Sequence, residues 1–370
     1  MRCGSGRRGA RGGDDAGGGD RRGDRRRSAA GDVRRCAGGG RGSGVARGAA
    51  ARTVVEVILT VTLNPAYDMT YRVENFEPGR THRVSSVEQR VGGKGINVTR
   101  VLNQIGKYSR ATGFADHAFS DAAERELPVD FVHALPWVRR TVVISDSHDG
   151  SATSLWEPGA RLTNPDAVDQ LLVRLSGLAA EAGGIVVSGS LPGGVRASLP
   201  ADLARIGLDA GVPVICDVDG LALEAAARVP GVILMPDLEE LAGLTGTRPA
   251  TTEEVAAAAA ALVGAGTGAV IATRSPDSMV AVTSDGAWSA VLPEPLSGNP
   301  IGAGDAAAAA VIAALAGPDR PEWPAILADA VATSAAAVVM AVAGEIDLSL
   351  RQRVLAEVVV EKLADPDGDC

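Results

Sequence analysis

Short apolar runs alternate with amphipathic stretches along most of the chain from Val57 onward. Residues 57–63 form an apolar run typical of a buried strand, and residues 96–105 have a helical periodicity that ends at Gly106. Further strands are predicted at residues 185–188, 212–217, 232–235 and 269–273, and helices at residues 165–182, 199–210, 221–227, 238–244 and 253–263. Strands that alternate with helices predict an α/β fold, in which helices flank both faces of a mostly parallel central sheet.

Two segments, 70–89 and 141–156, break this rhythm, because they are rich in β-forming residues and lack helical periodicity. The second segment carries an Asp149-Gly150 turn between two strands. Strands inserted into an α/β frame predict a small accessory sheet. We expect this sheet to act as a lid that closes over a ligand site and excludes water from the reaction.

The most apolar segments late in the chain are residues 308–316 and 330–343, and alanine dominates both. Each is shorter than the roughly 20 residues of a membrane span, so we expect buried core helices and no membrane partner. The N-terminus lacks the apolar stretch of a secretory signal. The four cysteines are scattered without metal-ligand spacing, which favours a reducing compartment and predicts a cytoplasmic protein.

The charge divides the chain into two parts. Residues 1–55 hold fourteen Arg and five Asp, without Lys or Glu, whereas the whole chain carries a net charge of -9. We therefore expect a disordered Gly/Arg-rich tail at residues 1–55 and one folded domain at residues 56–370. The tail could alternatively be an RNA-binding arm, although it lacks aromatic residues, or the product of a misplaced start codon. The acidic remainder argues against nucleic acid as a partner of the folded domain.

The strongest chemical signal is the run Asn299-Pro300-Ile301-Gly302-Ala303-Gly304-Asp305, which precedes an alanine-rich helix. Glycines allow a tight turn whose amides face outward at a helix N-terminus, where a phosphate or a developing oxyanion is stabilised. Asp305 is placed to accept the proton of an attacking hydroxyl group. The alternative is that Asp305 only caps the helix.

A second glycine-rich run, Gly92-Gly93-Lys94-Gly95-Ile96-Asn97, also opens a helix. Its glycines permit close approach of a ligand to the backbone, and Asn97 can both donate to and accept from a sugar hydroxyl. The run is not a P-loop, because GxxxxGK[ST] is absent. A turn that merely precedes a helix is the alternative.

Together the two runs resemble the signature motifs of the phosphofructokinase-B/ribokinase family of carbohydrate kinases. The stretches Thr62-Leu63-Asn64-Pro65-Ala66-Tyr67-Asp68 and Ser188-Gly189-Ser190-Leu191-Pro192-Gly193-Gly194 are similar to the 1-phosphofructokinase and tagatose-6-phosphate kinase branch. The resemblance extends from about Val57 to near the C-terminus. It implies a ribokinase-like fold with a small β-sheet lid, ATP and Mg²⁺ as cofactors, and a homodimer formed through the lid.

The resemblance also implies roles for particular residues. Asp305 would be the catalytic base, with the amides of Gly302, Ala303 and Gly304 as the anion hole. The sugar phosphate would be bound by Asp68, Gly92, Gly93, Lys94, Asn97, Arg140 and Ser190, with Arg80 or Arg83 closing from the lid. The nucleotide would be bound by Asp237, Glu240, Thr273, Arg274, Gly302 and Gly304, and Asp237 and Glu240 would hold the metal through water.

The nucleotide side departs from the family pattern at two places. Asp237 stands where the family has Asn, and Met235 replaces a Lys. The stretch from Thr273 to Asp277 lacks the glycines of the family's S-x-G-x-x-G turn, although Arg274 could pair with phosphates. These changes leave the acceptor side and the base intact.

The resemblance implies ATP-dependent phosphorylation of a ketohexose monophosphate, with fructose 1-phosphate as the first choice of acceptor. Tagatose 6-phosphate and fructose 6-phosphate are alternatives. The altered nucleotide side keeps open a sugar-phosphate-binding sensor with weakened catalysis. A nucleoside or ribose kinase is disfavoured, because an unphosphorylated sugar gives little reason for Lys94 and Arg140 to converge.

Overall fold

The computed structural model describes residues 57–317 and 322–364. All of these residues belong to one compact unit, Thr53–Cys370. The predicted tail at residues 1–55 lies outside the described residues. None of the described helices is long and apolar enough to cross a membrane.

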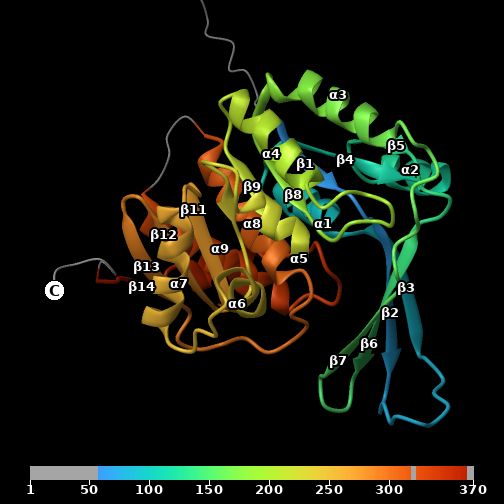
Figure 1. Ribbon diagram of the computed structural model, residues 1–370. Coiled ribbons are helices and arrows are strands. Elements are labelled where there is room, and N and C mark those ends of the chain that lie inside the picture. Colours follow the sequence, from blue (N-terminus) through green and yellow to red (C-terminus); the bar gives the residue numbers. More distant parts are fainter. Residues whose placement is uncertain (1–56, 318–321, 365–370) are drawn as a thin grey trace, which may run out of the picture. The chain divides into compact units, whose positions relative to one another are not determined.

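A ten-stranded sheet forms the centre of this unit, in the order β14-β13-β12-β11-β10-β9-β8-β1-β4-β5 (Figure 1). Seven neighbouring strands, from β5 to β11, run parallel. The last three form an antiparallel edge that the apolar pattern did not predict. The strands are β1 (Val57–Thr62), β4 (Ser109–Ala115), β5 (Val129–His133), β8 (Ala182–Ser188), β9 (Val214–Asp217), β10 (Ile233–Leu234), β11 (Ala269–Ser275), β12 (Ser278–Thr283), β13 (Gly286–Val291) and β14 (Val359–Lys362).

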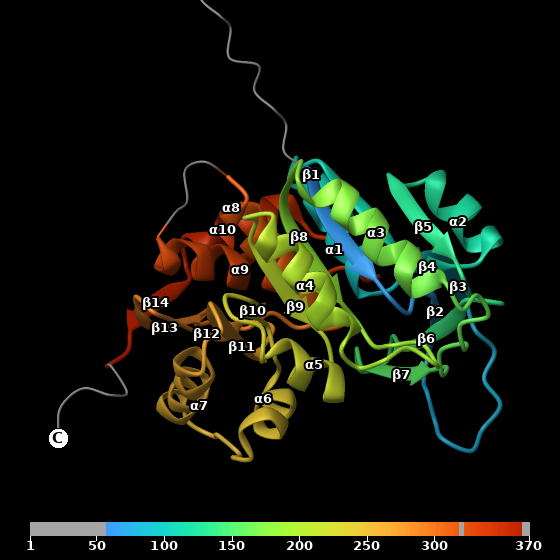
Figure 2. The ribbon, with the colours of Figure 1, turned by 45° about the horizontal axis from the view of Figure 1, so that its top comes forward.

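Helices cover both faces of this sheet, as predicted (Figures 1 and 2). Side chains of a strand alternate between its two faces, so Leu59 and Val61 join one core and Ile58 joins the other. The first core is covered by α2 (His117–Glu124), α3 (Ala167–Ala179), α4 (Leu199–Asp209), α5 (Gly220–Ala226), α6 (Leu238–Thr245) and α7 (Thr252–Gly264). The second is covered by α1 (Lys94–Gln104), α8 (Ala303–Leu315), α9 (Trp323–Val338) and α10 (Leu348–Leu355).

The two alanine-rich segments are core helices, because α8 and α9 bury most of their alanines in the second core. The second segment extends beyond the end of its helix, since α9 ends at Val338 and residues 339–343 form turns and bends. Val342 and Ala343 line a cavity instead. Their apolar character therefore belongs to a binding site and not to a helix face.

A second, four-stranded sheet has the order β3-β2-β6-β7 and extends away from the main sheet (Figure 1). It consists of β2 (Ala66–Val73), β3 (Ser86–Gly92), β6 (Arg139–Asp146) and β7 (Ala152–Trp156). β2 runs parallel to β6, and the other pairs are antiparallel. Both β-rich segments contribute to this sheet, although residues 74–85 of the first form a connection without regular structure.

Candidate active site

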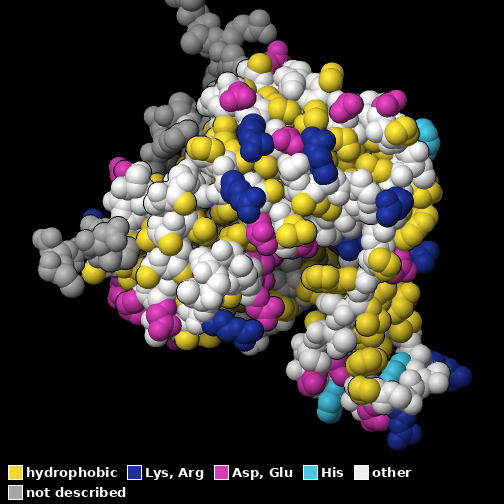
Figure 3. All heavy atoms as spheres, viewed as in Figure 1, with side chains coloured by type: hydrophobic (Ala, Val, Ile, Leu, Met, Phe, Trp, Pro, Cys, Tyr) yellow, Lys and Arg dark blue, Asp and Glu magenta, His cyan; other side chains and the backbone are white. Residues whose placement is uncertain are grey.

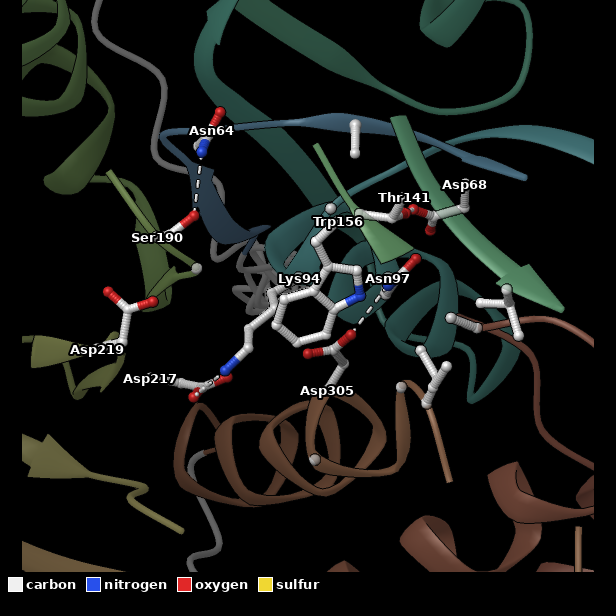
Figure 4. A pocket seen from close by; sticks show the side chains of 18 of the residues that line it. Asn64, Asp68, Lys94, Asn97, Thr141, Trp156, Ser190, Asp217, Asp219 and Asp305 are labelled. Atoms are coloured by element: carbon white, nitrogen blue, oxygen red, sulfur yellow. Dashed lines mark hydrogen bonds and ion pairs between the residues drawn. The ribbon is translucent and has the colours of Figure 1, made fainter. Parts of the chain in front are cut away.

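A cavity of about 470 Å³ lies where the carboxyl ends of the parallel strands meet the small sheet. Open α/β sheets bind ligands at this edge. Its lining includes the following described residues: Asn64, Asp68, Arg90, Gly93, Lys94, Asn97, Arg139, Thr141, Trp156, Ser190, Asp217, Asp219, Asp237, Glu240, Thr273, Gly302, Gly304 and Asp305. The two glycine-rich runs, about two hundred residues apart in sequence, therefore face one cavity (Figure 4).

Asp305 stands in the first turn of α8, which opens on Gly302. Gly302 has a φ of 88°, and a Cβ there would lie 2.8 Å from the Cβ of Ala343, so glycine is required on both counts. The amide of Ala303 donates to the carbonyl of Pro300 at 3.2 Å. Gly302 and Gly304 line the cavity, whereas Ala303 lines a smaller pocket beside it.

The carboxyl group of Asp305 is only 5% exposed, and Asn97 Nδ2 donates to its Oδ2 at 2.9 Å. Burial raises the pKa of Asp305 to about 7, while Lys94 and the Asn97 hydrogen bond oppose that rise. A carboxylate with a pKa near neutrality is a competent general base, because it is ionised yet basic enough to take a proton.

Lys94 Nζ lies 2.8 Å from Asp217 Oδ1, at the end of β9. Burial lowers the pKa of Lys94, but the carboxylates of Asp217 and Asp305 outweigh it and raise the pKa. Lys94 therefore stays positively charged between two carboxylates (Figure 4). Asp217 was not identified from the sequence, although its position at the carboxyl end of a predicted strand is a signal that could have found it.

Asp68 projects from β2 into the cavity, and Thr141 Oγ1 donates a hydrogen bond to its carboxylate. Gly92 does not line the cavity, but a Cβ at Gly92 would overlap the carboxylate of Asp68. Gly92 therefore makes room for Asp68. Burial raises the pKa of Asp68, while the Thr141 hydrogen bond and nearby arginines oppose that rise.

Arg139, and not Arg140, faces the cavity, because successive residues of β6 point to opposite faces of the small sheet. Arg139 Nη2 donates to Ser190 Oγ at 3.4 Å, and Asn64 Nδ2 donates to the same oxygen at 3.0 Å. Arg139 Nε is buried and has no hydrogen-bond partner in residues 57–317 and 322–364. Arg140 has a side chain 63% exposed and lies 4.0 Å from Glu157.

Arg80 and Arg83 lie in the exposed connection between β2 and β3, and neither lines the cavity. Arg80 Nε is 3.4 Å from Glu77 Oε2. The structure therefore brings together most of the residues expected at the acceptor, but these two arginines do not belong to the cavity lining.

Asp237 and Glu240 begin α6, where they form a reciprocal capping box. Asp237 Oδ1 accepts from the amide of Glu240 at 2.8 Å, and Glu240 Oε2 accepts from the amide of Asp237 at 2.9 Å. Burial raises the pKa of Glu240 to about 7. The described residues contain no group of three or more His, Cys, Asp or Glu side chains able to hold a metal ion. Each of the two carboxylates keeps one oxygen outside the capping box, and such oxygens suit Mg²⁺ bound through water.

The smaller pocket adjoins this end of the cavity and is lined by Thr273, Arg274, Ala303 and Ser334, among others. Ser334 Oγ and Arg274 Nε are buried and lack hydrogen-bond partners among the described residues. Arg274 Nη1 donates to Thr252 Oγ1 at 2.8 Å, which fixes the guanidinium beside the pocket. Buried polar groups without partners mark a place where a polar ligand supplies them.

Several known proteins are similar to this chain. The model of the pfkB family of carbohydrate kinases matches residues 60–347. A tagatose-6-phosphate kinase of Staphylococcus epidermidis is 28% identical over 267 residues, which cover 70% of this chain and 85% of that protein. Phosphofructokinase-2 of Escherichia coli is 27% identical, with a TM-score of 0.74 over 81% of this chain and 98% of that chain. A possible 1-phosphofructokinase of Thermotoga maritima, 24% identical, shares the fold with a TM-score of 0.76 over 84% of this chain and its own whole length.

The family match covers well over half of the chain and includes both glycine-rich runs and Asp305. The parallel sheet with a small accessory sheet agrees with the ribokinase-like fold of the solved relatives. The chain belongs to the pfkB family of carbohydrate kinases.

Proposed function

We propose that this protein transfers the γ-phosphate of ATP to a hydroxyl group of a ketohexose monophosphate. One observation carries the proposal: a carboxylate with a pKa of about 7, that of Asp305, faces the same cavity as the cluster of Arg139, Ser190 and Asn64. The first group can activate a hydroxyl, and the cluster can hold a phosphate already present on the sugar.

At the acceptor end, Asp68 and Asn97 bind sugar hydroxyls, because both line the cavity beside the base. Arg139 binds the phosphate of the acceptor. The other cations among the described lining residues are already paired, because Arg90 forms an ion pair with Glu345 and Lys94 with Asp217. Arg139 has no ion pair with a carboxylate among the described residues, so its charge is available to the phosphate.

At the other end, the nucleotide lies along Thr273, Arg274 and the start of α8, with its phosphates toward Gly302 and Gly304. Mg²⁺ bound with ATP would supply charge neutralisation at the transferring phosphate. Glu240 and Asp237 would hold it through water, using the carboxylate oxygens that the capping box leaves free.

In the reaction, the acceptor hydroxyl oxygen forms a bond to the γ-phosphorus while the bond from that phosphorus to the β,γ-bridging oxygen breaks. The hydroxyl proton passes to Asp305, whose Oδ1 is not engaged by Asn97. Lys94 and the amides of Gly302 and Gly304, at the start of α8, stabilise the negative charge on the transferring group. Closure of the small sheet over the cavity excludes water.

Fructose 1-phosphate is our first choice of acceptor. Two relatives above 25% identity support the alternative acceptors, tagatose 6-phosphate and fructose 6-phosphate. One is named a tagatose-6-phosphate kinase, and the other has been solved in complex with fructose-6-phosphate. These ketohexose monophosphates share one phosphate and several hydroxyls, so the same cluster of Arg139 and Ser190 serves each of them.

We further propose a homodimer formed through the small sheet. Val87 and Leu155 are exposed there at 48% and 57%, and hydrophobic side chains cover much of its visible surface (Figure 3). Phosphofructokinase-2 of E. coli has been solved in a tetrameric form. Light scattering should give twice the chain mass for the native protein and a monomer for Leu155→Glu.

The test of the reaction is an ADP-release assay with Mg-ATP across fructose 1-phosphate, fructose 6-phosphate, tagatose 6-phosphate, fructose and ribose. We expect turnover with one phosphorylated ketose at a kcat/KM at least tenfold above that with either unphosphorylated sugar. Equal turnover of ribose would contradict the assignment of Arg139. Binding of a sugar phosphate without any turnover would favour a sensor.

A further inference from the structure

A row of side chains crosses the face of the small sheet that looks into the cavity. The strand register places Arg90 opposite Asp68, Asp68 opposite Thr141, and Thr141 opposite Trp156. All four side chains line the cavity. Because neighbouring strands are about 4.8 Å apart, Trp156 stands about 10 Å along the row from Asp68.

Among the described residues that line the cavity, Trp156 is the only one with an aromatic side chain. Its side chain ends the row on the edge strand β7 and is 69% exposed. In Figure 4 the indole projects from the small sheet into the cavity, while Asp305 projects from α8 on the other side. A large exposed apolar side chain beside a polar binding site is typical of a surface that a ligand covers.

We propose that Trp156 is the apolar wall against which the carbon face of the acceptor sugar ring packs. This inference rests on the proposed function and adds a substrate class to it: a ring-closed ketohexose phosphate. A closed sugar ring directs its hydroxyls outward and leaves a flat C–H face. Asp68 and Asn97 bind the hydroxyls, and the indole covers the C–H face.

The residue next to Trp156 provides a built-in comparison. Leu155 points to the opposite face of β7, because successive strand residues alternate. Leu155 belongs to the surface proposed for the dimer, whereas Trp156 belongs to the cavity. A contact between two copies and a contact with the sugar can thus be separated by substituting one residue at a time.

The first experiment compares the kinetics of Trp156→Ala and Trp156→Phe with those of Trp137→Ala. Trp137 is also exposed, at 46%, but does not line the cavity. We expect Trp156→Ala to raise the KM for the sugar phosphate by about 3- to 10-fold and to leave the KM for ATP within twofold. Trp156→Phe should recover most of the loss, and Trp137→Ala should match the native protein.

An equal rise in both KM values for Trp156→Ala would overturn the proposal, because it would indicate a disturbed fold. A KM rise that disappears when the protein concentration is increased would also overturn it, since Trp156 would then act as a contact between copies. An unchanged KM would exclude any contact with the acceptor.

The second experiment needs no turnover. The indole fluorescence of the native protein and of Trp137→Ala should change on titration with the sugar phosphate alone, and that of Trp156→Phe should not. This keeps the inference testable if the kinase activity itself fails. An unchanged response in Trp156→Phe, or none in the native protein with any of the three sugar phosphates, would overturn the proposal.

A third comparison addresses the ring. An anhydrohexitol phosphate locked as a five-membered ring should compete with the acceptor several-fold better than the open-chain hexitol phosphate, because only the former has a flat C–H face. That preference should shrink to within twofold in Trp156→Ala. Equal competition by both analogues in the native protein would contradict a ring-closed acceptor.

Discussion

The two ends of the cavity differ in how far their polar groups are already paired. At the acceptor end, Asp68 is bonded to Thr141, Asp305 to Asn97 and Ser190 to Asn64, whereas Arg139 Nε has no partner among the described residues. At the nucleotide end, Arg274 Nε and Ser334 Oγ are buried and lack hydrogen-bond partners within the described part of the chain. Groups held by neighbours are positioned before a ligand arrives, whereas unpaired groups are completed by it. The carboxylates and the Ser190 hydroxyl of the acceptor end are therefore preorganised, and changes there should have the larger effects.

The largest effect should come from Asp305→Asn. The amide retains the shape and can still accept from Asn97, but it cannot take up the acceptor proton. We expect kcat to fall by about 10²- to 10⁴-fold, with dissociation constants for ATP and the sugar phosphate changed by less than about threefold. The measurements are steady-state kinetics and calorimetric titration. Asp285→Asn, in a surface turn, is the control, and near-native turnover of Asp305→Asn would exclude the assigned base.

The next largest effect tests whether Arg139 and Arg140 point to opposite faces of β6. Arg139→Gln should raise the KM for the sugar phosphate by about 10- to 100-fold, because hydrogen bonds to a charged group contribute about 1.5–3 kcal/mol. Arg140→Gln is the matched variant on the other face and should change the KM by less than twofold. If Arg140→Gln caused the larger loss, the phosphate would bind outside the cavity described here.

The pH dependence should follow Asp305. Its pKa is raised to about 7, so below that pH it becomes protonated and cannot act as a base. We expect kcat/KM to fall about tenfold per unit on the acid side of pH 7. Glu240 has a pKa raised to a similar value, so Glu240→Gln decides between the two groups. The acid limb should persist in that variant, and its disappearance would assign the limb to Glu240.

The smallest effect is expected at the nucleotide end. Arg274→Ala should raise the KM for ATP by about 3- to 10-fold and leave the KM for the sugar phosphate unchanged, since Arg274 lines only the smaller pocket. Arg248→Ala, on an exposed connection after α6, is the control. A selective rise in the KM of the sugar phosphate would mean that the two ends have been assigned in reverse.

The sequence predicted those parts of the site that depend on local signals. Glycines before a helix placed Asn97 and Asp305 at helix starts, and the family resemblance linked the two runs. Choosing between Arg139 and Arg140 requires knowing which face of β6 looks into the cavity. The residues next to them in the sequence do not carry that information. Trp156 lacked a local signal for the same reason, because it reaches the cavity only through the register of four strands.

For the fold, the sequence predicted the parallel strands of the central sheet but not its antiparallel edge. Apolar runs identified the parallel strands, since buried strands are nearly continuous in Val, Ile and Leu. The antiparallel edge was missed, because β14 comes from residues 359–362 and pairs with β13 only in the finished sheet. Residues 339–343 continued the apolar run of α9 past its end, and periodicity alone could not separate a helix face from a cavity wall.

The hydrogen bond between Asn97 and Asp305 joins residues 208 positions apart. Contacts so distant in sequence form late in folding, because a long loop must close first. The neutral-range pKa of Asp305 depends on burial that α8 acquires only when it packs against α1 and the sheet. A growing chain on the ribosome therefore carries an ordinary, acidic aspartate at position 305. Catalytic competence therefore arrives only after α8 has been synthesised and has packed against α1 and the sheet.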